Sequence, residues 1–231
     1  MKKLVVLTGA GMSADSGLST FRDSGGLWEG FNIEDVATVD GWTRDPEKVL
    51  DFYNKRRAQS ASAEPNDGHK AIANLEKFFE VQVITQNVDD LHERAGSSNV
   101  LHLHGMLNEA RSSKDPDAVV NIGADKIELG DKAEDGSQLR PNVVWFGEAV
   151  PNIEPASILV SSADILVVVG TSLVVYPAAG LIDFADDDIP KFIIDPTRPD
   201  LMQMGGWKHI SKTAAKGVPE LKKELIEHYT E

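Results

Sequence analysis

The chain has 231 residues, 41% of them hydrophobic, which suits one α/β domain with a substantial core. Acidic residues (37 Asp and Glu) outnumber basic ones (23 Lys and Arg), and the formal charge of −14 argues against direct binding to nucleic acid or an anionic membrane. The absence of cysteine excludes disulfides and thiolate metal sites. No apolar run approaches the ~20 residues that span a bilayer, and no secretory signal is recognisable, so we expect a cytoplasmic protein.

The first predicted element is a buried parallel strand at residues 4–7, which form a continuous apolar run. A turn of glycine and small residues follows, from Gly9 to Ala14. Such a turn lets the backbone approach a phosphate, and a helix that begins there directs its N-terminal amides at the anion. The spacing is not G-x-G-x-x-G, so a tight strand-to-helix turn without a ligand is the alternative. The start of the chain therefore suggests a dinucleotide site.

Three further apolar runs predict buried strands, at 81–85, 165–169 and 191–194. Each ends in small or polar residues. Ligands of open parallel sheets bind beyond the carboxyl ends of the strands, so all four strand ends are expected at one crevice. Helical patterns are predicted between or after these strands, at 46–60, 68–79, 89–95 and 219–229.

Two regions fit this alternation poorly, 23–65 and 108–142, the second being rich in Asp, Glu, Lys, Ser and Gly. We interpret them as two insertions that form a smaller lobe over the sheet. The larger lobe then comprises residues 1–22, 66–107 and 143–231. The predicted fold is α/β, with a Rossmann-like parallel sheet covered by helices on both faces.

Six short motifs occur along the chain in this order: Gly9-Ala10-Gly11-Met12-Ser13, Thr20-Phe21-Arg22-Asp23, Thr85-Gln86-Asn87-Val88-Asp89, Leu103-His104-Gly105, Val144-Trp145-Phe146-Gly147-Glu148 and Gly170-Thr171-Ser172. With these motifs the chain closely resembles the sirtuins, NAD-dependent protein lysine deacylases, over nearly its whole length. The resemblance implies NAD as cofactor and acylated lysines of proteins or peptides as substrates. The implied products are nicotinamide, free lysine and acyl-ADP-ribose.

His104 matches the family's general base, which acts on a ribose hydroxyl. Histidine suits this task because its ordinary pKa lies near neutrality. His102 stands two residues earlier and would share a side with His104 on a strand, so one of the pair is expected to be structural. The position of His104 directly before Gly105 favours His104 as the base.

The resemblance assigns cofactor binding to Gly9, Ala10, Gly11, Ser13, Ala14, Phe21, Arg22, Trp28, Gln86, Asn87, Asp89, Gly170, Thr171, Ser172, Asp195 and Ala214. Gln86 and Asn87 are also assigned to catalysis, since amides can orient hydroxyl groups. Capping of a strand end is the alternative for these amides, and a place in the core is the alternative for Phe21. The family usually has asparagine where this chain has Asp195.

The resemblance assigns the substrate peptide to Val144, Phe146, Gly147 and Glu148, in a segment that pairs with an extended peptide. An ordinary edge strand is the alternative. Helical spacing also puts Tyr53 and Arg56 on one face of the predicted helix at 46–60, together with apolar residues. The pair resembles the Tyr-x-x-Arg of the sirtuin subgroup that accepts succinyl- and malonyl-lysine, and Ala37 matches that subgroup's small pocket residue. A local carboxylate partner for Arg56, or extension of its charged end to solvent, is the alternative.

Many sirtuins bind zinc through two C-x2-C pairs on the small lobe, whereas residues 106–143 of this chain contain neither cysteine nor histidine. We therefore predict no metal site. An acidic cluster at 131–135 could suggest calcium, but a solvated turn is the favoured interpretation. Two other functions remain as alternatives: mono-ADP-ribosyl transfer, and a non-catalytic module that binds NAD or acyl-ADP-ribose. The oligomeric state is not predicted.

Overall fold

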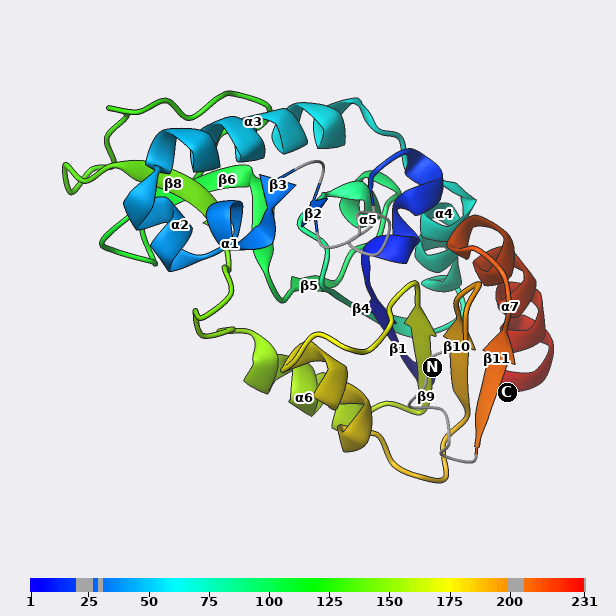
Figure 1. The fold of residues 1–231 in the computed structure, drawn as a ribbon. Coiled ribbons are helices and arrows are strands. Elements are labelled where there is room, and N and C mark those ends of the chain that lie inside the picture. Colours follow the sequence, from blue (N-terminus) through cyan, green and yellow to red (C-terminus); the bar gives the residue numbers. More distant parts are fainter. Residues whose placement is uncertain (20–26, 29–30, 199–205, 231) are drawn as a thin grey trace.

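A six-stranded parallel sheet forms the centre of the computed structural model, which describes residues 1–19, 27–28, 31–198 and 206–230 (Figure 1). The strand order is β11-β10-β9-β1-β4-β5, and every neighbouring pair is parallel. The strands are β1 (Lys3–Thr8), β4 (Glu80–Thr85), β5 (Val100–His102), β9 (Ile165–Val169), β10 (Lys191–Ile194) and β11 (Trp207–Ile210). The four predicted strands are confirmed and lie side by side, so their carboxyl ends share one edge.

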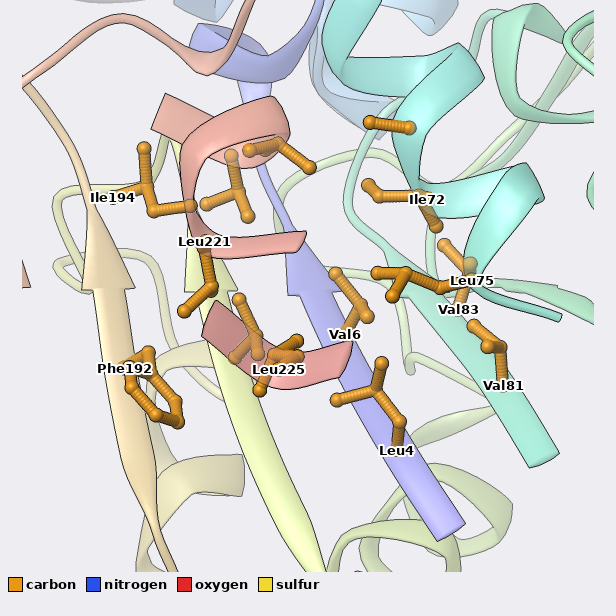
Figure 2. Packing of buried hydrophobic residues seen from close by; sticks show 14 of the residues in the cluster. Leu4, Val6, Ile72, Leu75, Val81, Val83, Phe192, Ile194, Leu221 and Leu225 are labelled. Atoms are coloured by element: carbon orange, nitrogen blue, oxygen red, sulfur yellow. The ribbon is translucent and has the colours of Figure 1, made fainter. Parts of the chain in front are cut away.

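Alternate side chains of these strands enter two separate cores, as the period of two in a strand requires. On one face, Leu4 and Val6 pack against α4 (Asp67–Leu75) and α7 (Ala214–Tyr229), as Figure 2 shows. On the other face, Val5 and Leu7 belong to a core shared with α6 (Ile153–Ser161) and the 3-10 helix η3 (Ala178–Phe184). Helices therefore cover both faces of the sheet, as predicted.

A small lobe stands beside this sheet (Figure 1). Its antiparallel sheet has the order β7-β6-β8. The strands are β6 (Gly105–Ser112), β7 (Val119–Asn121) and β8 (Leu139–Val143), and α3 (Pro46–Ser62) packs on β6 and β8. The rest of the lobe consists of α1 (Ile33–Val36), α2 (Val39–Arg44) and the short pair β2 (Leu27–Trp28) and β3 (Phe31–Asn32).

Four predicted helices differ from those observed. The glycine turn leads into two 3-10 turns, η1 (Ala10–Met12) and η2 (Ala14–Ser16), and residues 9–19 contain no α-helix. The predicted helix at 219–229 begins at Ala214, because Val218 and other residues of its first turns are buried in the core and Pro219 is accommodated inside the helix. The predicted helix at 68–79 ends at Leu75, and α5 covers only Leu91–Arg94.

No helix of the described residues is long and apolar enough to cross a membrane.

Candidate functional site

A cavity of about 610 Å³ lies at the carboxyl ends of β1, β4, β9 and β10, and residues of the small lobe complete its wall. All the predicted site residues whose side chains are described line this cavity. They are Gly9, Ala10, Gly11, Ser13, Ala14, Ala37, Tyr53, Arg56, Gln86, Asn87, Asp89, His104, Val144, Phe146, Gly147, Glu148, Gly170, Thr171, Ser172, Asp195 and Ala214. Phe21 and Arg22 lie outside the described residues, and only the backbone of Trp28, in β2, is described.

Glycine is required where the loops after β1 and β9 touch. The Gly11 amide donates to the Gly170 carbonyl at 2.8 Å. A Cβ on Gly11 would lie 2.7 Å from the Gly170 Cα, and Gly170 itself has φ +62°. The two loops therefore meet backbone to backbone, which an alanine at either position would prevent. At this end of the sheet the cavity is therefore lined mostly by backbone atoms.

The loop after β4 is held by hydrogen bonds around Asn87. Its amide N–H donates to the Thr85 hydroxyl at 3.0 Å, and its side-chain NH₂ donates to the Ser13 hydroxyl at 3.0 Å. Ser13 in turn donates to Asp89 at 3.0 Å. Burial raises the pKa of the Asp89 carboxyl, while the bonds from the Leu91 amide and from Ser13 act in the opposite direction. Asn87 and Asp89 are thus fixed before any ligand binds.

His104 lies just beyond β5, and among the described residues one of its two ring nitrogens has a hydrogen-bond partner. Its Nδ1 is 3.0 Å from the carbonyl oxygen of Gln86. A carbonyl can only accept, so Nδ1 carries the proton and Nε2 of the neutral ring is left as an acceptor. Burial lowers the pKa of His104, which keeps the ring neutral at physiological pH. The geometry suits a base that removes a proton from a group in the cavity.

His102 has a different environment, although it is only two residues away. As the last residue of β5 it contacts the Asn87 carbonyl through Nδ1 (3.0 Å) and Glu93 through Nε2 (2.8 Å). The hydrogen bond and charge of Glu93 raise the pKa of His102 against the effect of burial. His104 lines the cavity, whereas His102 does not. His102 is the structural member of the pair in this geometry.

The predicted face of α3 is buried, and two of its polar side chains line the cavity. Tyr53 is 1% exposed and Arg56 is 9% exposed. The Arg56 guanidinium lies 5.8 Å from the centre of the Phe52 ring. Ala37 also lines the cavity, and its carbonyl accepts from the Phe146 amide at 2.9 Å. The arrangement provides a hydroxyl and a cation in a region largely screened from water, which suits an anionic group.

Asp195 follows β10 and is 3% exposed. Its carboxylate accepts from the Thr197 amide at 2.9 Å. Ala214, at the first turn of α7, lines the same end of the cavity. This is the position in an open parallel sheet at which an acidic residue can bind ribose hydroxyls.

Hydrogen bonds connect the loops of the small lobe within residues 106–143. The Ser112 hydroxyl donates to Asp135 at 2.6 Å and is 2.7 Å from the Ser137 hydroxyl. The bonds from both serines lower the pKa of the Asp135 carboxyl to about 2. Within the described part of the chain, no group of three or more His, Asp or Glu side chains could hold a metal ion.

Sequence reasoning missed Trp145 as a residue of the cavity wall, although it lies in one of the six motifs. Trp145 is 2% exposed, and its indole N–H donates to the Tyr53 hydroxyl at 3.1 Å. It also missed Tyr176, which lies beyond β9 and is 68% exposed at the cavity mouth. The strand and helix patterns gave no signal for Tyr176, because it belongs to neither.

The chain is similar to several known proteins. Residues 9–177 match the family model described as the Sir2 family. An NAD-dependent protein deacylase from Bacteroides thetaiotaomicron is 54% identical over 231 residues, which cover 98% of this chain and 99% of the relative. A solved Sir2 homologue in complex with NAD has a TM-score of 0.89 at 39% identity, covering 100% of this chain and 91% of its own. A Sir2 structure with 2′-O-acetyl-ADP-ribose and a deacetylated p53 peptide has a TM-score of 0.75 at 30% identity, covering 97% and 92%.

Proposed function

The chain belongs to the Sir2 family and is an NAD-dependent protein deacylase, and on this basis we propose which parts of the cavity bind NAD and the acyl-lysine. We also propose which acyl groups the enzyme removes. When bound, NAD would supply an activated ribose, whose anomeric carbon can bond to the acyl oxygen of the substrate as nicotinamide leaves. The residues at the strand ends fit this group, since closely packed glycine backbone, buried amides and a carboxylate can receive phosphates and ribose hydroxyls. Gly9 to Ala14 and Gly170 to Ser172 would hold the phosphates, and Asp195 and Ala214 the adenosine end.

His104 is the general base in this proposal. With NAD bound, its Nε2 would accept the proton of a ribose hydroxyl, and the ring could return that proton to the lysine nitrogen as free lysine leaves. The Gln86 carbonyl supports this role, because it holds the Nδ1 proton and stabilises the ring once both nitrogens carry protons. Gln86 and Asn87 would orient the ribose, with Asn87 already fixed by Thr85 and Ser13.

The peptide substrate would lie along the segment from Val144 to Glu148, with backbone hydrogen bonds supplying affinity and placing few demands on its sequence. The acyl chain of its lysine would then extend toward α3.

We propose that the preferred acyl groups are acidic, namely succinyl and malonyl, with acetyl as a poorer substrate. The observation that carries this proposal is that Tyr53 and Arg56 both line the cavity from the buried face of α3. Arginine can bind a carboxylate through two N–H donors, and a site screened from water strengthens the pair. An acetyl group lacks the carboxylate, so it gains nothing from the cation.

The proposal is tested by incubating matched acetyl-, malonyl- and succinyl-lysine peptides with the protein and NAD, and identifying the products by mass spectrometry. Acidic acyl groups should be removed faster, with nicotinamide and acyl-ADP-ribose formed in equal amounts. Lys55→Met is the matched control, because it removes an exposed cation from the same helix and should leave the order of substrates unchanged. Faster removal of acetyl than of either acidic group would contradict the proposal.

The same products separate the two alternative functions. Mono-ADP-ribosyl transfer would attach ADP-ribose to the peptide and leave its acyl group in place. A binding module would consume no NAD. His104 Nε2, which has no hydrogen-bond partner among the described residues, favours an enzyme over a binding module, because binding alone requires no base.

We also propose that the small lobe, at 23–65 and 108–142, folds without a structural metal. The chain has no cysteine, and the bonds among Ser112, Asp135 and Ser137 already connect β6 to the loop before β8. Neutral hydroxyls and one carboxylate make a poor zinc site.

A further inference from the structure

The Tyr53 hydroxyl is constrained by the ring that lies beside it. An indole N–H can donate a hydrogen bond but cannot accept one, so the bond from Trp145 Nε1 at 3.1 Å makes the Tyr53 oxygen the acceptor. No other hydrogen bond of this hydroxyl is present among the described residues. Its own proton is therefore directed away from Trp145, and Tyr53 lines the cavity that takes the acyl chain.

The Trp145 ring is itself held firmly. The Arg140 guanidinium lies 3.3 Å from the ring centre, in a cation–π contact. Arg140 also binds Glu148 at 2.8 Å, and Glu148 accepts from the Trp145 amide N–H at 2.8 Å. Both the backbone and the ring of Trp145 are thus fixed to the same ion pair, which leaves its N–H little freedom to turn from Tyr53.

We propose that Trp145 is a specificity-determining positioning residue, which by donating to the Tyr53 oxygen commits the Tyr53 hydroxyl to act as a donor toward an acyl carboxylate. The inference rests on the proposed preference for acidic acyl groups. A carboxylate offers only acceptors, so a committed donor matches it and Arg56 provides the charge. The methyl end of an acetyl group can accept nothing from this hydroxyl. Trp145 itself does not contact the carboxylate in this account.

Burial supports the assignment, since it raises the pKa of Tyr53 and keeps the hydroxyl protonated under physiological conditions. The hydrogen bond from Trp145 and the positive charges of Arg56 and Arg140 lower the pKa of Tyr53, but burial outweighs them, and the negative charge of Glu148 acts with burial. Tyr53 therefore keeps a proton to donate at physiological pH.

The test compares kcat/KM for matched succinyl- and acetyl-peptides in wild type, Trp145→Phe, Tyr53→Phe and the double variant. Trp145→Phe keeps an aromatic ring and removes the N–H donor, so the succinyl-to-acetyl ratio should fall about two- to tenfold. Trp42→Phe is the matched control: its ring centre lies 5.6 Å from that of Trp145, it does not line the cavity, and the ratio should be unchanged. In the Tyr53→Phe background, Trp145→Phe should change the ratio no further, since its effect acts through the missing hydroxyl.

A second substitution guards against misfolding of Trp145→Phe. Replacing Trp145 by a tryptophan analogue with sulfur in place of the ring N–H keeps the bicyclic shape, and should lower the ratio by a similar factor. Equal losses for both peptides, or an undiminished effect of Trp145→Phe when Tyr53 is phenylalanine, would overturn the assignment. The Arg56→Met variant separates the two proposals. If it lowers the succinyl-to-acetyl ratio while Trp145→Phe does not, only the role of Trp145 is wrong; if neither lowers it, acidic-acyl recognition fails and the inference with it.

Discussion

At the carboxyl ends of the parallel strands, the cavity is walled by backbone and short polar side chains, whereas its small-lobe side is formed by long side chains from α3 and the segment around Trp145. The first side is fixed by contacts such as that of Gly11 with Gly170, and the second by an ion pair and an indole hydrogen bond. From this difference we infer that cofactor chemistry and the choice of acyl group depend on separate parts of the cavity. Substitutions on the first side should affect every substrate alike, and those on the second should alter the preference.

The largest effect is expected for His104→Ala, on the strand-end side. Loss of a general base costs typically 10²- to 10⁴-fold in rate, and the loss should be the same for acetyl- and succinyl-peptides. Turnover kinetics with both peptides and calorimetric titration with NAD measure this, and most of the NAD binding should persist. A variant with near-normal turnover would show that another group is the base.

The pH profile of the wild type provides the control. The base must be neutral to accept a proton, and burial lowers the pKa of His104. Activity should therefore fall as the pH drops, with a midpoint below the ordinary histidine value of about 6.5. A midpoint clearly above that value would point to His102, whose pKa is raised by Glu93.

Gly11→Ala should rank next. The added Cβ would lie 2.7 Å from the Gly170 Cα, so one of the two loops must move. Overpacking of this kind costs typically 1–3 kcal/mol in stability. We expect a lower melting temperature and weaker NAD binding, whether the assay uses the acetyl- or the succinyl-peptide. Gly17→Ala is a contrasting variant, since nothing lies within 4 Å of its Cβ position and only its φ of +87° opposes the change. Equal NAD affinities in the two variants would contradict the close-contact explanation.

A smaller effect is expected for Ser112→Ala in the small lobe, which removes the hydroxyl that donates to Asp135. Because the pKa of Asp135 is lowered to about 2, its contribution to stability is present above the unfolded carboxyl pKa of about 4 and is lost as the pH falls toward 2. Melting curves from pH 7 to pH 2.5 should show the variant less stable at neutral pH and the two proteins converging in acid. Elemental analysis of the wild type should find no stoichiometric zinc; chelator-resistant zinc would overturn the metal-free account of the lobe.

The smallest effect concerns Asp195, whose carboxylate would repel the 2′-phosphate of NADP. The wild type should prefer NAD, and Asp195→Asn should narrow that preference without changing the order of acyl groups. Rates with both cofactors at low concentration measure it. An unchanged preference in Asp195→Asn would assign the discrimination to another residue.

The sequence predicted best the features that depend on local patterns. The apolar runs indicated β1, β4, β9 and β10, and the helical spacing correctly placed Tyr53 and Arg56 on the buried face of α3. The sequence-based prediction was wrong where an element depends on contacts between distant parts of the chain. The beginning of α7 depends on its packing against the sheet, which outweighs the usual signal from Pro219.

The site shows the same limit. The family motifs favoured His104, yet the reason that His102 differs is its bond to Glu93, which no spacing reveals. The hydrogen bond from Trp145 to Tyr53 joins residues 92 positions apart, and it depends on the packing of α3 against the segment around Trp145, which local sequence patterns do not predict. Periodicity identifies a buried face but not the partner that covers it.

The separation of chemistry from acyl choice is tested most directly by Arg56→Met, assayed as kcat/KM with matched acetyl- and succinyl-peptides beside the wild type. Losing a hydrogen-bonded charged partner costs about 1.5–3 kcal/mol, so the account predicts that desuccinylation falls roughly ten- to a hundredfold while deacetylation changes far less. Equal proportional losses on the two peptides would mean that Arg56 supports the fold rather than the acyl group, and would contradict the account.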